Sequence, residues 1–223
     1  MAKKYDNESI ASLKGADRVR KRPGVIFGSD DLEGCEHSVF EILSNSVDEA
    51  REGFGKHITL TKYEDGSIEV ADEGRGIPIE WNPKEERYNW DLVFCELYAG
   101  GKNDNAGNYE YALGLNGLGT CSTQYASAFM DVTVYRDGNE YSLHFEKGEN
   151  KTDAECGYLV AEAPKKKSGT VIRWLPDREV FTDIDIPVEY FTDTLKRQAI
   201  VNDGLLFEFR EQQGSRFVSR DIV

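Results

Sequence analysis

The chain has 223 residues, a length typical of one compact domain, and its net charge of −14 disfavours non-specific DNA binding by the chain alone. Its apolar runs are short and its lysine-rich start lacks the apolar stretch of a signal peptide, so the sequence predicts neither a membrane span nor export. Cysteines at positions 35, 95, 121 and 156 fit neither a paired metal site nor a disulfide-dense fold. We therefore expect reduced thiols in a cytoplasmic protein.

Positive charge is concentrated at the start of the chain. Residues 1–29 carry seven basic and three acidic side chains, whereas the remainder is strongly acidic. A segment of this sign either contacts nucleic acid or an acidic partner, or is a solvated face. Its charge alone leaves both interpretations open.

Apolar periodicity predicts most of the secondary structure. Strand pairs around Asp65-Gly66 and Asp137-Gly138 have the signature of β-hairpins. The predicted elements, in chain order, are a helix at 35–51, a hairpin within 58–70, a helix at 90–98, a helix after the glycine-rich stretch 100–119, a hairpin within 132–145, strands at 158–161 and 170–175, a helix at 188–201 and a last strand at 205–209. Strands follow one another through short turns, so we expect an α+β fold: a mixed, mostly antiparallel sheet with helices on one face.

The stretch 100–119 is the first candidate for a ligand-binding segment. It contains six glycines and four asparagines in twenty residues, and a connection of that length inside a compact domain is usually a functional lid or a disordered insert. Consecutive backbone N–H groups before a helix, with Lys102 nearby, would suit phosphate groups. The alternative is a flexible surface loop. Neither a P-loop nor a dinucleotide fingerprint occurs, and the three histidines have no zinc spacing.

The predicted helix at 35–51 carries a polar stripe. At 100° per residue, one arc of about 100° holds three carboxylates and an amide, and apolar residues fill the arc opposite. The stripe consists of Glu41, Asn45, Asp48 and Glu49. It is either a solvated face, or a site where an amide oxygen binds a divalent metal and a Glu one turn away deprotonates a water.

Two further motifs are weak individually. Asp72-x-Gly74-x-Gly76 follows a predicted strand, where the carboxylate would accept hydrogen bonds from a planar ligand and the glycines would allow its close approach. Ordinary turns also produce this pattern. Ser168-Gly169-Thr170, at the start of another strand, means little by itself.

Taken in order, these motifs resemble the nucleotide-binding set of the GHKL ATPase superfamily. Flanking segments narrow the resemblance to the N-terminal ATPase domain of bacterial type II topoisomerase B subunits, meaning gyrase B or topoisomerase IV B. Those segments are Tyr5–Ile10, Leu13–Gly15, Val19–Gly24, Gly74–Pro78 and Ala99–Lys102. The resemblance implies a two-layer α/β sandwich (Bergerat fold) and a single domain over 1–223, with an N-terminal arm at 1–15 and an ATP lid at 100–119. It also implies that the transducer and DNA-cleavage domains lie outside this chain.

The resemblance further implies roles for the matching residues. Glu41 would be the general base for the attacking water, and Asn45 would be a Mg²⁺ ligand. Asp72 would bind the adenine amino group, supported by Thr170 and a bridging water. Catalytic Lys102 and the backbone of the glycine-rich segment would hold the phosphates. The full set implied to contact ATP adds Glu49 paired with Arg75, Gly76, Ile77, Pro78, Gly101, the lid residue Tyr109, Gly114, Leu115, Asn116, Gly117, Leu118, Gly119 and the rim residue Arg136.

The implied cofactors are ATP and Mg²⁺, in a cytoplasmic protein without a membrane partner. The implied partners are a second B subunit, reached by the arm with Tyr5 and Ile10, and the A subunit and DNA, reached by domains outside this chain. The implied function is ATP hydrolysis in which ATP-driven dimerisation gates DNA passage. An alternative is a nucleotide-dependent dimerisation switch with negligible hydrolysis. Kinases and chaperones of the superfamily are disfavoured by the flanking segments. Leu113 and Asn116 depart from the usual Gly and His of the family's glycine-rich motif.

Overall fold

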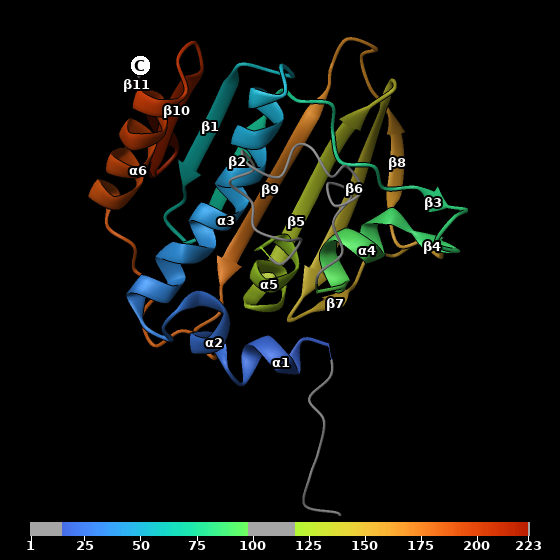
Figure 1. Ribbon diagram of the computed structural model, residues 1–223, viewed down its shortest axis with the longest axis horizontal. Helices are drawn as coiled ribbons and strands as arrows, with labels where there is room; N and C mark the ends of the chain where they lie inside the picture. Colours follow the sequence, from blue (N-terminus) through green and yellow to red (C-terminus); the bar gives the residue numbers. More distant parts are fainter. Residues whose placement is uncertain (1–14, 98–118, 223) are drawn as a thin grey trace, which may run out of the picture.

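The computed structural model describes residues 15–97 and 119–222. One nine-stranded sheet forms a layer, and helices cover one of its faces (Figure 1). The expected α+β sandwich is confirmed.

The large sheet is mixed but mostly antiparallel. Its strands run in the order β11-β10-β1-β2-β9-β5-β6-β7, and β8 also pairs with β6. β1 and β10 pair in parallel, and the other described pairings are antiparallel. The bounds are β1 (His57–Lys62), β2 (Ile68–Asp72), β5 (Ser127–Arg136), β6 (Asn139–Glu146), β7 (Glu149–Asn150), β8 (Leu159–Glu162), β9 (Gly169–Pro176), β10 (Leu206–Gln213) and β11 (Arg216–Ile222). A separate ribbon joins β3 (Trp81–Asn82) to β4 (Arg87–Tyr88).

The described helices differ widely in length. They are α1 (Asp17–Arg20), α2 (Pro23–Phe27), α3 (Leu32–Arg51), α4 (Asn89–Cys95), α5 (Gly119–Tyr125) and α6 (Val188–Val201). The longest, α3, begins at Leu32 rather than at the predicted Cys35, because the Asp31 carboxylate caps it by accepting from the Glu33 N–H at 3.0 Å. Helix α3 crosses the middle of the sheet in Figure 1, where it can present side chains to several strand ends.

The core lies between α3 and the sheet. Val39, Leu43 and Val47 on α3 are fully buried, and the strands contribute alternate residues such as Val132 and Trp174. These residues belong to one continuous apolar cluster. The period of 3.6 on α3 and the period of 2 on the strands are therefore satisfied at the same interface.

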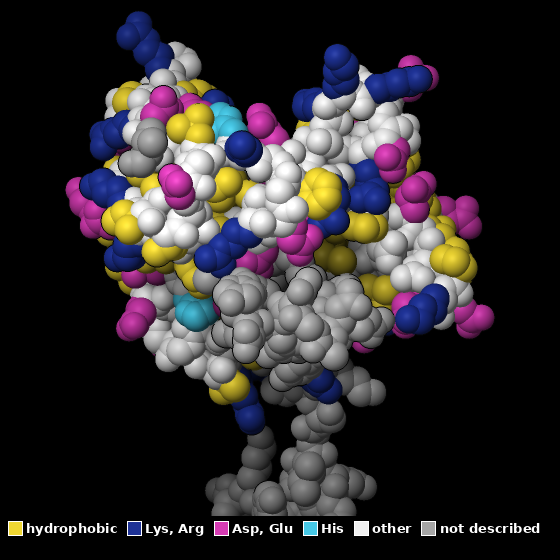
Figure 2. All heavy atoms as spheres, turned by 45° about the horizontal axis from the view of Figure 1, so that its top comes forward, with side chains coloured by type: hydrophobic (Ala, Val, Ile, Leu, Met, Phe, Trp, Pro, Cys, Tyr) yellow, Lys and Arg dark blue, Asp and Glu magenta, His cyan; other side chains and the backbone are white. Residues whose placement is uncertain are grey.

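The positions that alternate with the core on β2, β9, β5 and β6 include a row of charged and titratable side chains. Glu69 lies opposite Arg173, Arg173 opposite Asp131, and Asp131 opposite His144. Opposite charges in neighbouring positions stabilise such a surface. Figure 2 shows acidic and basic side chains interspersed over the described part of another face of the molecule.

Most predicted elements are present, but several elements were missed and some bounds differ. Leu205–Phe209 corresponds to β10 but is not the last strand, because β11 follows and pairs with it. The ribbon β3–β4, the short strand β7 and the short helices α1 and α2 were not predicted. The predicted helix at 90–98 is α4, which ends at Cys95. No described helix is long and apolar enough to cross a membrane.

The described part of the basic segment is partly structural. Arg20 on α1 is bound through its guanidinium to Asp177 at 2.5 Å and to the Tyr125 carbonyl at 3.0 Å. Lys21 pairs with Asp17 at 2.7 Å. Arg20 therefore ties α1 to the end of α5 and to the loop after β9, and it is not a free cation for nucleic acid.

Candidate active site

The Asp72 carboxylate, at the end of β2, is held by three donors. Its Oδ1 accepts from the backbone N–H groups of Gly74 at 2.9 Å and Thr170 at 3.1 Å, and its Oδ2 accepts from the Ser46 hydroxyl at 2.7 Å. Burial raises the pKa of Asp72, and these hydrogen bonds offset part of the rise. Such a rigid carboxylate is suited to accept a hydrogen bond from a ligand.

The approach of β9 to Asp72 depends on Gly169. Its φ is +135°, and a Cβ there would lie 2.0 Å from the Asp72 carbonyl oxygen. A larger residue would therefore push Thr170 away from the carboxylate. The Gly169-Thr170 pair, almost uninformative as a sequence motif, thus has a definite packing role.

A polar rim surrounds this carboxylate. Arg75 is bidentate to Glu49, at 2.7 and 2.9 Å, as the family resemblance implied, and it lies 3.9 Å over the Phe54 ring. On the other side, the Ile77 N–H donates to the Thr170 hydroxyl at 3.2 Å. The rim is completed by Arg136, which donates to the Gly76 carbonyl at 2.9 Å, and by Pro78, which is exposed.

A second carboxylate lies on the same helix. Glu41 Oε1 is 2.8 Å from His37 Nε2, one turn earlier on α3. Its Oε2 faces the start of α5 so closely that a Cβ on Gly119 would lie 2.1 Å from it. Only glycine fits there without displacing the carboxylate. Glu41 is therefore fixed between a histidine and a helix N-terminus.

Asn45, one turn after Glu41, is also oriented. Its side-chain nitrogen donates to the Thr120 hydroxyl at 2.9 Å and to the Glu41 carbonyl at 3.1 Å. Both contacts use the amide nitrogen, so they turn the carbonyl oxygen away from these partners. A hard oxygen ligand is thereby presented next to Glu41.

The structure thus brings most of the predicted residues that it describes to one side of α3. The polar stripe is not a freely solvated face: Asp48 is 4% exposed, and Glu41, Asn45 and Glu49 are half-buried against β2, the rim and α5. The sequence analysis missed several contacting residues, among them His37, Ser46, Phe54 and Thr120. The predictions that lie outside the described residues are Tyr5, Ile10, Gly101, Lys102, Tyr109, Gly114, Leu115, Asn116, Gly117 and Leu118.

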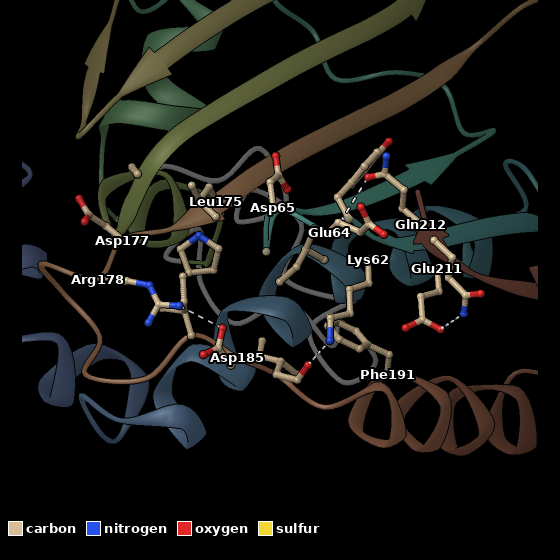
Figure 3. Close-up of a pocket in the computed structure, with 18 residues that line it drawn as sticks. Lys62, Glu64, Asp65, Leu175, Asp177, Arg178, Asp185, Phe191, Glu211 and Gln212 are labelled. Atoms are coloured by element: carbon tan, nitrogen blue, oxygen red, sulfur yellow. Dashed lines mark hydrogen bonds and ion pairs between the residues drawn. The ribbon is translucent and has the colours of Figure 1, made fainter. Parts of the chain in front are cut away.

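A separate pocket of about 660 Å³ lies at the ends of β2 and β9 that are remote from Asp72 and Gly169 (Figure 3). Charged side chains in its lining already have partners: Lys62 Nζ donates to the Ile186 carbonyl at 2.8 Å, and Arg178 pairs with Asp185 at 3.1 Å. None of the predicted site residues lines it. We assign it no ligand.

The chain is similar to known proteins over nearly its whole length. It is 38% identical over 209 residues to the B subunit of DNA gyrase from Thermotoga maritima, and 36% identical over 208 residues to the B subunit of DNA topoisomerase 4 from Francisella tularensis. A solved topoisomerase IV ATP-binding domain of Francisella tularensis, in complex with a small-molecule inhibitor, aligns with a TM-score of 0.75 and 31% identity, over 93% of this chain and 95% of that one. The chain belongs to the gyrase B and topoisomerase IV B family.

The chain spans about a third of the length of these relatives. The match to the Thermotoga gyrase protein covers 94% of this chain but 32% of that relative, and the match to the Francisella topoisomerase protein covers 93% of this chain but 32% of that relative. No protein-family model matches the chain. The family membership confirms the resemblance stated from the motifs.

The contact between His37 and Glu41 makes a pH-dependent contribution to folding stability. The hydrogen bond to Glu41 raises the pKa of His37 above its ordinary value of 6.5, so the protonated histidine stabilises the folded chain. This contribution is fully present below the unfolded pKa and is lost as the pH rises through the folded pKa. We expect His37→Gln to lower the melting temperature by roughly 1–3 °C at low pH and by nothing above the raised pKa.

Thermal unfolding between about pH 5.5 and 8.5 measures this difference. The control repeats the comparison in a Glu41→Gln background, where the partner of the imidazolium is gone and the pH dependence should disappear. A difference that stays constant across the range would show that His37 acts by packing alone.

Proposed function

We propose that this chain is the ATP-binding and ATP-hydrolysing domain of a bacterial type II topoisomerase B subunit. The observation that carries the proposal is that one helix, α3, positions both an oriented acceptor and a candidate base. Ser46 holds Asp72 at 2.7 Å, and Glu41 lies five residues earlier, about 7–8 Å along the helix axis. A ligand with an amino-bearing ring at one end and a reactive phosphate at the other could contact these two groups with its opposite ends.

Asp72 would bind the adenine. An ionised carboxylate accepts hydrogen bonds and cannot donate them, so it complements an exocyclic amino group. Thr170 supports this end, because its hydroxyl accepts from Ile77 N–H and keeps its own proton for a ligand or a water. Arg75, Gly76, Ile77, Pro78 and Arg136, with Glu49 holding Arg75, would line the outer rim around the base.

Glu41 would activate water at the other end. Its carboxylate would take a proton from a water molecule as that water attacks the γ-phosphorus, and the bond to the bridging oxygen of ADP would break. His37 holds one carboxylate oxygen at 2.8 Å and so would fix the direction of the other. The N-terminus of α5, at Gly119, would place backbone N–H groups near the phosphates.

Asn45 fits a Mg²⁺ ligand. Its nitrogen is bound by Thr120 and Glu41, which leaves the amide oxygen, a hard ligand, for the ion. The described residues contain no group of three or more His, Cys, Asp or Glu suited to a metal, so water and nucleotide phosphates would complete the coordination. When bound, Mg²⁺ would neutralise charge on the phosphates.

The rest of the predicted function concerns residues outside the described part or outside the chain. Gly101, Lys102, Tyr109 and residues 114–118 would form the lid over the phosphates, with Lys102 neutralising charge at the γ-phosphate. The arm with Tyr5 and Ile10 would contact a second B subunit, and further domains would reach the A subunit and DNA. We place 1–223 in a single domain of a cytoplasmic enzyme that couples ATP-driven dimerisation to DNA strand passage.

Calorimetric titration with a non-hydrolysable ATP analogue tests the binding proposal. We expect saturable binding that weakens when Mg²⁺ is removed with EDTA, because the ion shields the phosphates from nearby carboxylates. A matching GTP analogue is the control and should bind much more weakly, because its ring presents a carbonyl oxygen to Asp72. Absence of binding at physiological ATP concentrations would contradict the proposal that this chain acts alone as an ATPase.

The same preparation distinguishes a self-sufficient enzyme from one gated by dimerisation, and absence of turnover would favour the dimerisation switch. Turnover that rises linearly with protein concentration would identify a self-sufficient enzyme, whereas a steeper rise would show that dimerisation gates the reaction.

A further inference from the structure

Ser46 contacts the Asp72 carboxylate, although Ser46 is not one of the specified residues of any motif. It lies on α3, is 6% exposed, and donates its hydroxyl proton to Asp72 Oδ2 at 2.7 Å. A hydroxyl has one proton, so a Ser46 hydroxyl that donates to Asp72 is only an acceptor toward any other group. Ser46 therefore acts as the donor, and Asp72 as the acceptor, in the contact between them.

The three donors around Asp72 use its acceptor positions unequally. Oδ1 receives the N–H groups of Gly74 and Thr170, whereas Oδ2 receives Ser46 alone. An ionised carboxylate has about four acceptor positions, two on each oxygen. With respect to the described residues, the position that remains is the second one on Oδ2. Ser46 thus determines which lone pair faces a ligand.

We propose that Ser46 is a positioning residue that makes this site selective for purines with a 6-amino group. The inference rests on the proposed function, since it concerns the carboxylate to which adenine is assigned. Three donors hold the Asp72 carboxylate as an acceptor, and they come from three elements: α3, the turn after β2, and β9. Together they fix the plane of the carboxylate. An N–H of the ligand then completes the shell, whereas a carbonyl oxygen at the same ring position would face a second acceptor.

Removal of the Ser46 hydroxyl would loosen this arrangement in one specific way. The backbone donors of Gly74 and Thr170 would still hold Oδ1, but Oδ2 would be free to turn out of the ligand plane. Burial raises the pKa of Asp72, and the Ser46 bond opposes that rise, so the variant carboxyl would also be protonated more readily. Both effects weaken the preference for an amino group rather than nucleotide binding in general.

The test compares two ligands with two proteins by calorimetry. The ligands are non-hydrolysable triphosphate analogues of adenosine and of purine riboside, which lacks the 6-amino group, and the proteins are wild type and Ser46→Ala. We expect wild type to prefer the adenosine analogue by about 10- to 100-fold, and Ser46→Ala to reduce that preference by about fivefold. The ratio is independent of the fraction of folded protein, because both ligands see the same sample.

Ser44→Ala is the matched control. Ser44 is on the same helix and is 1% exposed, but its hydroxyl donates to the Glu41 carbonyl at 3.0 Å, so its removal should leave the ligand preference unchanged. Equal weakening of both ligands by Ser46→Ala, or no change in the ratio, would overturn the inference while leaving the proposed function intact. A wild-type chain that binds neither analogue would overturn the proposed function, and the inference with it.

Discussion

The Glu41→Gln variant is expected to bind ATP and to hydrolyse it about 10² to 10⁴ times more slowly than wild type. Glutamine keeps the size and the hydrogen-bonding shape of Glu41 but cannot take a proton from water. His37 can still contact the side-chain oxygen, and the close approach of Gly119 is unchanged. Binding should survive because the proposed adenine contacts lie at Asp72. Phosphate release at saturating ATP measures the turnover, and calorimetry with the non-hydrolysable analogue measures the affinity.

Glu33→Gln provides the control. Glu33 is exposed on the same helix two turns earlier, and the same substitution there should leave turnover within a factor of about two. Turnover of Glu41→Gln close to that of the control would show that another group deprotonates the water. A parallel loss of affinity would show instead that Glu41 contacts the nucleotide in its ground state.

Much of the fold follows from local patterns that this sequence displays strongly. Helix α6 has the predicted bounds, 188–201, and the Asp65-Gly66 and Asp137-Gly138 turns join the expected strands. The apolar arc of α3 is the face packed into the core. In each case the hydrophobic period and the turn chemistry indicate the same element, and the tertiary contacts agree with that local preference.

The missed elements lack such agreement. Strand β11 has six exposed residues and therefore no clear apolar face, and it is recognisable by its pairing with β10. In the ribbon β3–β4, each strand has two residues, and the turn places Glu86 at a φ of 52° without a glycine. The parallel pairing of β1 with β10 joins His57 to Leu206, a contact between distant segments that no local pattern encodes.

The missed residues of the candidate site also differ in whether local spacing could have identified them. His37 is four residues before Glu41, on the same side of α3, so helical spacing could have identified it as a neighbour of the candidate base. Ser46 could not be found in this manner, because it lies within the apolar arc, where a small polar residue is ordinary in a buried position. Its contact with Asp72 depends on how β2 packs against α3, which is a tertiary relationship.

Asp72→Asn is expected to lower the affinity for the ATP analogue by about 10- to 100-fold without destabilising the fold. The N–H groups of Gly74 and Thr170 require an oxygen at the Oδ1 position, so the amide nitrogen would occupy the Oδ2 position and present a donor to the adenine amino group. Burial raises the pKa of Asp72, which means that the charged carboxylate disfavours folding at neutral pH. The melting temperature of the variant should therefore equal or exceed that of wild type.

Asp65→Asn, at the other end of β2, is expected to show the opposite pattern. Partial burial raises the pKa of Asp65, but the hydrogen bonds from Ser67 and the contact with Arg173 at 3.0 Å outweigh it, so the net pKa is lowered. The charge of Asp65 therefore favours folding at neutral pH. This contribution is lost as the pH falls through the lowered pKa. Asp65→Asn should lower the melting temperature and leave nucleotide affinity unchanged. If both variants lost affinity together, the loss would follow from general destabilisation of β2. If Asp72→Asn retained full affinity, the adenine would have to bind elsewhere. A loss confined to Asp72→Asn, in a variant at least as stable as wild type, would assign the adenine contact to this carboxylate.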